Sequence, residues 1–453
     1  MQARRSMGRL RALVAAAALV SGALAVPGAA IQASTPDLAN AQAGHTGGWV
    51  GEKQYDASAP DDWEPAIAAD PHSPYVYALA TRYGTEPPCP VDCPSPFIVL
   101  RVSHDGGASW GPVHPLCACT GAGQFDPLIE VVPATGVVYA TFMRDDFVVF
   151  MKSTDHGAHW SAPADTHGQA AWTDKPAMAM SDSGRDVYVS WNGPSDGDPY
   201  VAQSHDYGAT WKQTKLVDSA RYFYAFDADV APDGTVYFSE SSLDYQPPLS
   251  NTPVGNVEHH VFISRDHGKH WEDHLVAVVK VGLVCGGSDC RDDFWIGHSA
   301  LSADGRGNLV LLYDGARTEG GLQTISVRRS TDEGKHWSGV TTLSTSGEEA
   351  TSPAVESRGN GDVRAWWMET SGANIDRWNV WYRSSTDGGA HWSAKVKLSD
   401  RTGGASYKKK GGFLQVYGDY GEIAITNAGK TIAIWGEGSS YLGPGGIWYN
   451  RQN

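Results

Sequence analysis

The feature that most constrains the fold is a short pattern, S-x-D-x-G-x-x-W, which occurs six times in the 453-residue sequence. The successive tryptophans of these copies are 50, 51, 60, 66 and 55 residues apart. Four fixed positions that recur at nearly regular spacing predict a repeat architecture. The six copies are Ser103–Trp110, Ser153–Trp160, Ser204–Trp211, Ser264–Trp271, Ser330–Trp337 and Ser385–Trp392.

The pattern has the chemistry of a tight hairpin turn. Its Asp can accept hydrogen bonds from turn amides, and its Gly provides a backbone conformation that other residues avoid. Its Trp is expected to fill the wedge beside the next unit, so these positions are structural. Histidines within or beside the turns are expected to be solvated and not catalytic, namely His104, His156, His159, His205, His267, His270, His336 and His391.

Each copy lies inside a larger unit of four predicted strands. In the first unit, residues 66–68 and 75–77 predict two strands joined by a turn, and residues 97–100 predict a third strand before the hairpin. Four short strands in a repeated unit are typical of a β-propeller blade. The low charged fraction of 19%, with 52 Gly and 17 Trp, agrees with a turn-rich β protein. The units are expected to begin near Glu64, Asp126, Asp174, Asp227, His298 and Ser352.

A seventh unit, residues 418–449, has three predicted strands and lacks the hairpin pattern. Residues 49–55 resemble the strands that follow the hairpins elsewhere. We therefore predict an all-β protein, a β-propeller of seven four-stranded blades, in which the N-terminal strand completes the last blade and removes both free edges. The alternative is a propeller of six blades with the last unit as an appendage.

The hairpin pattern is the Asp-box, and the chain resembles the Asp-box (bacterial neuraminidase repeat) families, whose best-known members are the sialidases. The resemblance covers nearly the whole of residues 47–453 and implies the propeller fold. In a propeller, the loops between strands two and three and between consecutive blades open on one face, and the Asp-box turns lie on the other. A ligand site is therefore expected on the open face.

The resemblance also implies a set of site residues. In sialidases three arginines hold the sugar carboxylate, a Tyr assisted by a Glu is the nucleophile, and an Asp is the general acid and base. The family's chain order of these groups implies Tyr420, Glu240 and Asp126 as catalytic residues, with Arg82, Arg291 and Arg317 as substrate-binding residues. The early F/Y-R-I-P motif of the family is absent from this chain. Trp172 and Trp295 add aromatic planes on which a sugar can stack.

The first residues of the chain predict export. Residues 1–30 are expected to be a secretory signal peptide, because four arginines precede an apolar run and small residues follow it. Residues 31–46 are expected to form a flexible N-terminal segment, and residues 47–453 a single propeller domain. No later run is long enough to span a bilayer. The mature protein is therefore expected to be secreted, either extracellular or periplasmic.

Six cysteines in a secreted chain predict disulfide bonds. Cys285 and Cys290 share one loop between blades and are expected to pair with each other. The other expected pairing joins the group Cys89 and Cys93 to the group Cys117 and Cys119.

Charge and motifs exclude several classes of partner. The formal net charge is −16, and −20 without residues 1–30, so nucleic acid and anionic membrane surfaces are not expected to bind. The chain has no phosphate-binding Gly loop, Rossmann pattern or G-x-S-x-G motif, so no cofactor is expected. The acidic loops at residues 196–198 and 292–293 lack EF-hand spacing, so no metal site is assigned. We expect a monomer whose partner is a carbohydrate.

Three functions are compatible with these observations. The first is a secreted sialidase-like glycoside hydrolase that removes an anionic, sialic acid-type sugar from the end of a glycan. The second is a propeller without catalytic activity that binds glycan or protein. The third is a polysaccharide lyase, in which His298 would be the residue to test as the base, because it lies where other blades begin with a carboxylate.

Overall fold

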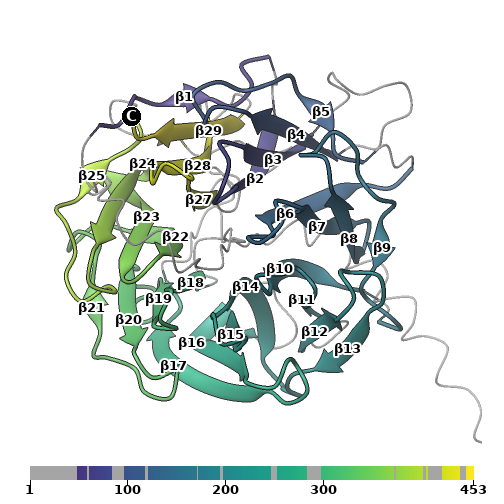
Figure 1. Cartoon of the computed structure of the whole chain (residues 1–453). Coiled ribbons are helices and arrows are strands. Elements are labelled where there is room, and N and C mark those ends of the chain that lie inside the picture. Colours follow the sequence, from purple (N-terminus) through teal and green to yellow (C-terminus); the bar gives the residue numbers. More distant parts are fainter. Residues whose placement is uncertain are drawn as a thin grey trace, which may run out of the picture.

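The computed structural model describes residues 48–58, 61–83, 96–117, 121–170, 172–193, 197–245, 253–282, 297–371, 374–400, 405–406, 421–438 and 445–453. These residues form seven antiparallel sheets that lie in a ring around one axis (Figure 1). The predicted all-β propeller of seven blades is confirmed. The alternative of six blades is wrong, because residues 421–425, 431–438 and 445–451 form the strands of a sheet within the ring.

Within blades one to six the strands follow one another in chain order from the axis outward (Figure 1). Blades one to three consist of β2 (Asp62–Ala69), β3 (Val76–Arg82), β4 (Phe97–Ser103) and β5 (His114–Pro115); β6 (Gln124–Val131), β7 (Val138–Arg144), β8 (Phe147–Ser153) and β9 (Ala164–Asp165); and β10 (Asp174–Met180), β11 (Val187–Asn192), β12 (Pro199–Ser204) and β13 (Lys212–Lys215).

Blades four to six follow the same plan. They consist of β14 (Tyr222–Val230), β15 (Val236–Tyr245), β16 (Pro253–Ser264) and β17 (Glu272–Lys280); β18 (Ser299–Ala303), β19 (Leu309–Tyr313), β20 (Ser326–Ser330) and β21 (Thr341–Thr342); and β22 (Ala350–Arg358), β23 (Asp362–Ser371), β24 (Asn374–Ser385) and β25 (Val396–Lys397). In blade six a further two-residue strand, β26 (Ala405–Ser406), pairs with β24.

The seventh blade joins the two ends of the described chain. It contains β27 (Gly421–Ile425), β28 (Thr431–Gly438) and β29 (Gly445–Arg451), and its outermost strand is β1 (Lys53–Gln54) from the N-terminal side. Lys53 lies opposite Tyr449, and an isolated bridge joins Trp49 to Gln452. The N-terminal strand thus completes the last blade as predicted, which closes the ring between the last blade and the first.

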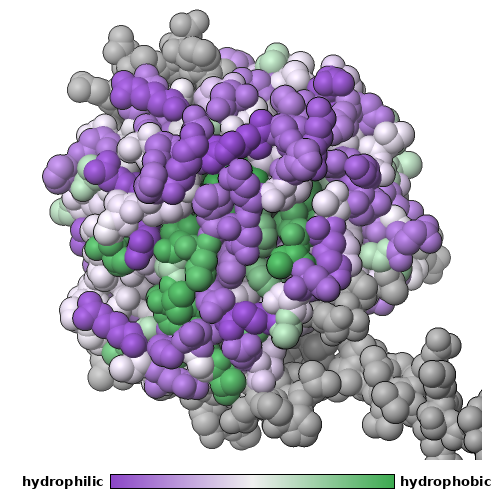
Figure 2. Space-filling model, turned by 90° about the horizontal axis from the view of Figure 1, so that it is seen from below, coloured by the Kyte–Doolittle hydropathy of each residue, from purple (hydrophilic) through white to green (hydrophobic). Residues whose placement is uncertain are grey.

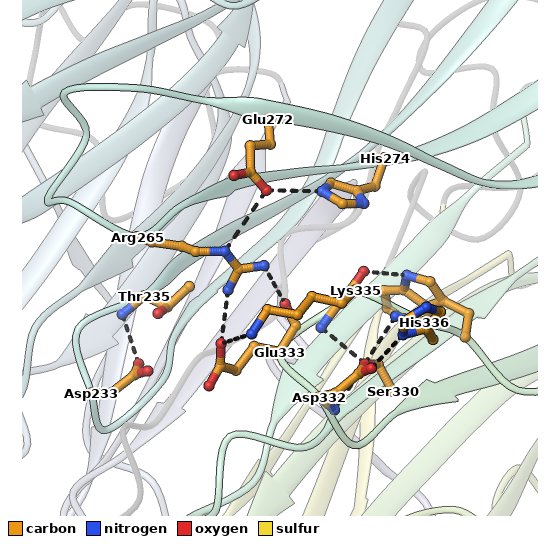
Figure 3. Close-up of polar contacts among 12 residues, drawn as sticks. Asp233, Thr235, Arg265, Glu272, His274, Ser330, Asp332, Glu333, Lys335 and His336 are labelled. Carbon is orange, nitrogen blue, oxygen red and sulfur yellow. Dashed lines mark hydrogen bonds and ion pairs between the residues drawn. The ribbon is translucent and has the colours of Figure 1, made fainter.

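The Asp-box turns have the hydrogen bonds that the sequence predicts. In blade five, Ser330 Oγ donates to Asp332 Oδ1 at 2.8 Å, and the Gly334 N–H donates to Ser330 Oγ at 2.9 Å (Figure 3). The box glycine has a φ of 78° to 83° in all six copies, a range that favours glycine. A Cβ on Gly334 would also lie 2.5 Å from Ile263 Cδ1 of blade four. The glycine therefore serves both the turn and the close approach of two blades.

The box tryptophans lie on the opposite side from the one expected. Trp271 of blade four contacts Phe238 of its own blade, with ring centroids 5.7 Å apart, and Tyr188 of blade three, with centroids 6.5 Å apart. Trp211 of blade three likewise contacts Phe150 of blade two. Each indole thus fills the wedge beside the preceding blade and not the next. The reason is that the box turn itself lies against the preceding blade, as Gly208 does at Phe150 and Gly268 does at Tyr188.

Buried carboxylates link the innermost strands of neighbouring blades. The innermost strand has no neighbour on its axial side, so its backbone N–H groups there need other acceptors. The Ile67 N–H donates to Glu422 Oε2 across the seam from blade seven to blade one, at 2.7 Å. Across the seam from blade four to blade five, the Leu301 N–H donates to Asp227 Oδ2 at 2.7 Å, and the Ala303 N–H donates to Asp229 Oδ2 at 2.6 Å.

Two of the sequence predictions concern residues outside the described part of the chain. The proposed signal peptide and the N-terminal segment end before residue 48, where the described residues begin. Of the six cysteines, only Cys117 is described, and it is buried, so the disulfide pairings stay a prediction. Within the described ranges, no helix is long and apolar enough to cross a membrane.

Truncating a box tryptophan should destabilise the seam between two blades. We expect Trp271→Ala to lower the free energy of unfolding by about 3 kcal/mol, the low end of the range for a truncated core aromatic, because the ring is half-buried. Denaturant unfolding would measure the change, with Val340→Ala as a control at an exposed apolar site. A loss no larger than that of the control would contradict the packing role of Trp271.

Candidate functional site

The two ends of the ring differ in which loops they carry. Strands alternate in direction, so the Asp-box turns lie at the same end as the turns between strands one and two, where the Gly106 N–H donates to the Pro74 carbonyl at 2.8 Å. The connections from strand two to strand three, and from one blade to the next, lie at the other end, here called the open end. Each innermost strand begins at the open end.

A β-bulge recurs where the innermost strands begin. It interrupts the register of β2, β6, β10, β14 and β22 with their neighbours. In four of these five strands a residue other than glycine has a φ between 48° and 55°, namely Glu64, Asp126, Lys175 and Ser352. Each such conformation costs on the order of 1 kcal/mol and is retained when the surroundings require it. These strained residues therefore lie near the open end, where the innermost strands begin.

Glu64, Asp126 and Lys175 of three consecutive blades meet at these bulges. The Asp126 N–H donates to Glu64 Oε2 at 3.0 Å, and Lys175 Nζ lies 3.5 Å from Asp126 Oδ1. The Tyr83 hydroxyl reaches Glu64 Oε1 at 3.4 Å, and the Lys175 N–H donates to the side chain of Asp174 at 2.9 Å. All of these residues except Tyr83 and Asp174 are almost fully buried. The three blades therefore assemble one carboxyl cluster around a lysine, here called the acid–lysine cluster (Glu64, Asp126, Asp174 and Lys175).

Burial controls the protonation of this cluster. It raises the pKa of the Glu64 carboxyl, the charge of Asp126 raises it further, and Lys175 opposes the shift. Burial also raises the pKa of the Asp174 carboxyl, while Lys175 lowers it. The cluster therefore favours a mixture of protonated and ionised carboxyls near neutral pH, which is the state that general acid–base catalysis needs.

Three tyrosines of blade four lie at the open end beside blade three. The Tyr222 hydroxyl accepts a hydrogen bond from Asn192 Nδ2 at 2.8 Å, and the hydroxyls of Tyr224 and Tyr245 lie 2.6 Å apart. The rings of Tyr222 and Tyr224 have centroids 4.8 Å apart. Burial is the main cause that raises the pKa of Tyr222, and the charge of Asp174 adds to it. Aromatic rings with fixed polar groups at their edges are typical of carbohydrate sites.

A second polar group lies at the open end of blades five and six. His298 Nδ1 is 3.0 Å from Asp314 Oδ2, and the Thr351 hydroxyl donates to the same oxygen at 2.6 Å. The Ser352 N–H also contacts Asp314 Oδ2, at 3.3 Å. The ring of Phe226 packs edge-on against His298, with centroids 5.5 Å apart. An aspartate that engages Nδ1 of a histidine orients the ring and supports proton transfer at the other nitrogen.

Of the predicted substrate-binding arginines, Arg82 is held within blade one. Its guanidinium donates to both oxygens of Asp62, at 2.7 and 2.8 Å, and to Asp56 at 2.8 Å. The Arg82 side chain is 1% exposed, and these carboxylates occupy the fork that would hold a sugar carboxylate. The sequence pattern does not show this pairing, because Asp56 and Asp62 precede Arg82 by 26 and 20 residues.

The predicted catalytic residues occupy separate places. Asp126 belongs to the acid–lysine cluster described above. Glu240 lies in the seam between blades three and four, where it is fully buried and accepts a hydrogen bond from the Ser190 hydroxyl at 2.5 Å. Burial raises the pKa of Glu240 to about 8. Tyr420, the expected nucleophile, lies outside the described residues.

Of the four remaining predicted residues, two lie in the described part of the chain and two lie outside it. Arg317 is exposed in the connection that follows β19 at the open end, and Trp172 is half-buried just before β10. Arg291 and Trp295 lie outside the described residues. Arg317 and Trp172 thus remain available for a ligand at the open end, while Arg82 is engaged with two carboxylates.

The sequence carries a signal for the acid–lysine cluster that the family pattern did not reveal. Each of the four strained bulge residues directly precedes a proline, as in Glu64-Pro65, Asp126-Pro127, Lys175-Pro176 and Ser352-Pro353. Proline has no N–H, so it leaves no unpaired donor where the bulge breaks the ladder. A polar residue before a proline at the start of four units therefore marks residues that gather at the open end.

The described residues give no support for a metal centre. Among them, no three His, Cys, Asp or Glu side chains are placed to hold a metal ion. Asp198, from one of the acidic loops, instead accepts hydrogen bonds from Lys215 Nζ at 2.6 Å and from the Ser219 N–H at 2.9 Å. Asp196, Asp292 and Asp293 lie outside the described residues.

Comparisons with known proteins identify the fold. No family model and no curated protein matches the chain. Among solved structures, the chain is similar to an ulvan lyase of the polysaccharide lyase family PL25 bound to -[GlcA(1-4)Rha3S]-, with 12% identity, a TM-score of 0.52, and coverage of 87% of this chain and 95% of that one. The polysaccharide lyase Uly1 matches with 13% identity, a TM-score of 0.50, and coverage of 95% and 97%.

Sialidases are also found among the matches. The NanB sialidase of Streptococcus pneumoniae matches with 12% identity and a TM-score of 0.45, and the match covers 88% of this chain and 70% of that one. At these identities the likeness to either group concerns the propeller fold.

The buried Glu240 gives a prediction for the pH dependence of stability. Because its pKa is raised in the folded state, the folded protein holds this proton more tightly than the unfolded chain, and stability is lost as the pH rises through about 8. Glu240→Gln keeps an acceptor for Ser190 and cannot ionise. We expect its stability relative to the unmodified protein to increase by at least about 1 kcal/mol between about pH 6 and pH 9, since one pKa unit corresponds to about 1.4 kcal/mol.

Urea unfolding at both pH values would measure this difference. Glu319→Gln, at an exposed glutamate, is the control and should show no such increase. A difference between Glu240→Gln and the unmodified protein that does not change with pH would contradict the burial of an ionisable carboxyl in this seam.

Proposed function

We propose that the protein is a secreted glycan-cleaving enzyme, a glycoside hydrolase that acts at the open end of the propeller. The observation that carries this proposal is the acid–lysine cluster, in which the backbone N–H of Asp126 donates to the Glu64 carboxyl of the neighbouring blade at 3.0 Å and Lys175 approaches Asp126 from a third blade. Glycoside hydrolysis requires one protonated carboxyl to donate to the leaving oxygen and a second group to stabilise or attack the sugar.

We propose different roles for the two carboxyls on electrostatic grounds. Glu64 is the proposed general acid, because burial and the neighbouring charge of Asp126 both favour its protonated form. Asp126 is the proposed ionised partner, since Lys175 Nζ lies 3.5 Å from its carboxylate. Asp126 thus stays among the proposed catalytic residues as the ionised carboxylate, while the general-acid role that the family resemblance implies for it passes to Glu64.

The surroundings of the cluster suit a sugar. Tyr222 and Tyr245 are partly exposed and provide aromatic planes and hydroxyls at the open end, where Asn192 fixes the Tyr222 hydroxyl. Tyr224 is buried behind them and holds the Tyr245 hydroxyl. The hydroxyl groups of a sugar need such fixed polar partners, and the apolar face of its ring stacks on aromatic side chains.

We further propose that the sugar removed is anionic and of the sialic acid type. Arg82 is engaged by Asp56 and Asp62, so the sugar carboxylate would be met by Arg317, which is exposed at the open end, together with Arg291. Tyr420 is the proposed nucleophile, because an uncharged phenol is not repelled by the sugar carboxylate.

The hydrolase proposal predicts a large effect of single substitutions. On a panel of sialosides, uronides and neutral glycosides, the purified protein should release free sugar, and Glu64→Gln should reduce kcat by about 10²- to 10⁴-fold, the usual contribution of a general acid. Tyr420→Phe should abolish turnover of the anionic substrates, and Glu319→Gln should leave it unchanged. Release of sugar by Glu64→Gln at the unmodified rate would remove Glu64 as the acid.

A second candidate function is a polysaccharide lyase, which the His298–Asp314 pair favours. A histidine whose Nδ1 lies 3.0 Å from a buried carboxylate is oriented to abstract a proton beside a uronate carboxylate. The solved lyases share the propeller fold with this chain.

The mass of the product separates the two reactions. Hydrolysis adds one water to the products, whereas elimination gives an unsaturated sugar that is lighter by that water and absorbs ultraviolet light. For a lyase, His298→Ala should abolish this absorbance on a uronate polysaccharide and Glu64→Gln should not. Binding of glycans without any product in either assay would instead support a binding propeller.

A further inference from the structure

The proposed general acid is closed off from any ligand. Glu64 is 0% exposed, and its carboxyl lies in the seam between blades one and two, where Oε2 accepts the Asp126 N–H at 3.0 Å. A group that gives a proton to a substrate must come within about 3.2 Å of the atom that receives it. The proton of Glu64 therefore has to pass through a neighbouring group that reaches the open end.

Two of the side chains in and beside the acid–lysine cluster are only half-buried. They are Tyr83 and Asp174, whereas Glu64, Asp126 and Lys175 are at most 4% exposed. The Tyr83 hydroxyl lies 3.4 Å from Glu64 Oε1, the carboxyl oxygen that does not accept the Asp126 N–H. Asp174 instead accepts the Lys175 N–H at 2.9 Å with its Oδ1. Tyr83 is therefore the neighbour through which the carboxyl of Glu64 can act on a ligand.

The backbone holds Tyr83 in this position. Its N–H donates to the Asp61 carbonyl at 2.9 Å, which continues the pairing of β2 with β3 by one residue past the end of β3. The Asp61 side chain also accepts a hydrogen bond from Trp63 Nε1 at 2.6 Å, and Trp63 directly precedes Glu64. Both Tyr83 and Glu64 are thus fixed by one pair of strands, which gives the precise distance that proton transfer needs.

A phenol suits a position between a buried carboxyl and a ligand. Its hydroxyl donates one hydrogen bond and accepts another at the same time, so it can receive a proton from one side while it gives a proton to the other. The side chain that replaces it in a Phe variant has nearly the same shape and lacks only the oxygen. The role of the hydroxyl can therefore be tested with little change in packing.

We propose that Tyr83 is the residue that gives the proton to the leaving oxygen of the glycan, and that Glu64 resupplies Tyr83. As the bond between the sugar carbon and the leaving oxygen breaks, the Tyr83 hydroxyl proton moves to that oxygen and the Glu64 proton moves to the Tyr83 oxygen. The water that adds to the sugar carbon loses a proton, which returns to Glu64 through Tyr83. This relay rests on the proposed hydrolase function and adds Tyr83 to its catalytic residues.

The outer rim of the ring provides a control surface. Figure 2 views the side of the ring that holds β17 at the bottom of Figure 1, and shows apolar residues gathered among polar ones. On β17, Leu275 is 52% exposed. Its aliphatic side chain can neither donate nor accept a proton, so shortening it should leave the reaction at the open end unchanged.

The choice of leaving group tests the relay. On a glycoside that releases a sugar alcohol, Tyr83→Phe should lower kcat by about 10²- to 10⁴-fold, as Glu64→Gln should, because the departing oxygen needs a proton. On the dinitrophenyl glycoside of the same sugar, whose leaving group departs without a proton, both variants should keep most of their activity. Tyr207→Phe, at a tyrosine of an Asp-box turn that is 47% exposed, and Leu275→Ala should match the unmodified protein on both substrates.

A double variant tests whether the two residues act in one path. Because Glu64 acts through Tyr83, Tyr83→Phe/Glu64→Gln should have the kcat of the slower single variant. Losses that multiply, or an equal loss from Tyr83→Phe on both glycosides, would overturn the relay. Full activity of Tyr83→Phe on the sugar alcohol glycoside, with Glu64→Gln impaired, would overturn the relay and leave the hydrolase in place. Release of sugar from neither glycoside by the unmodified protein would overturn both.

Discussion

The structure depends on how the innermost strands satisfy their axial backbone groups. A propeller blade has a neighbour strand on one side of its innermost strand and an open axis on the other, and an unpaired buried N–H costs about 1–3 kcal/mol. This chain places carboxylates there, so that Glu422 receives the N–H of Ile67 and Asp227 receives the N–H of Leu301. Burial raises the pKa of Glu422 and of Asp229 well above their usual values. Seam bonds and Asp-box turns together join blades that are otherwise separate sheets.

The candidate site, at the open end of the ring, also contains a carboxyl group that accepts a backbone N–H across a seam between blades. Glu64 accepts the N–H of Asp126 across the seam from blade one to blade two, as the other seam carboxylates do farther along the axis. It differs from them in lying at a strained bulge next to Lys175 and Asp126. A carboxyl that joins two blades thus lies at the open end, where the proposed reaction would take place.

The fold was predictable because its signals are local and repeated. Six copies of one turn give the blade period, and residues 49–55 could be recognised as a missing outer strand from their likeness to its equivalents. The direction in which the box tryptophans lean was not predictable, because it depends on how the turn is set against the neighbouring sheet. The site residues were harder to predict from the sequence than the fold. Arg82 fitted the family's chain order, but its pairing with Asp62 and Asp56 is set by register within blade one.

The most direct measurement is a crystal structure of the Glu64→Gln variant soaked with an oligosaccharide that the unmodified protein binds. Our account predicts density for the sugar at the open end, in contact with Asp126 or Lys175 and with a tyrosine of blade four. Sugar bound at the Asp-box end of the ring, or on the outer rim, would contradict it.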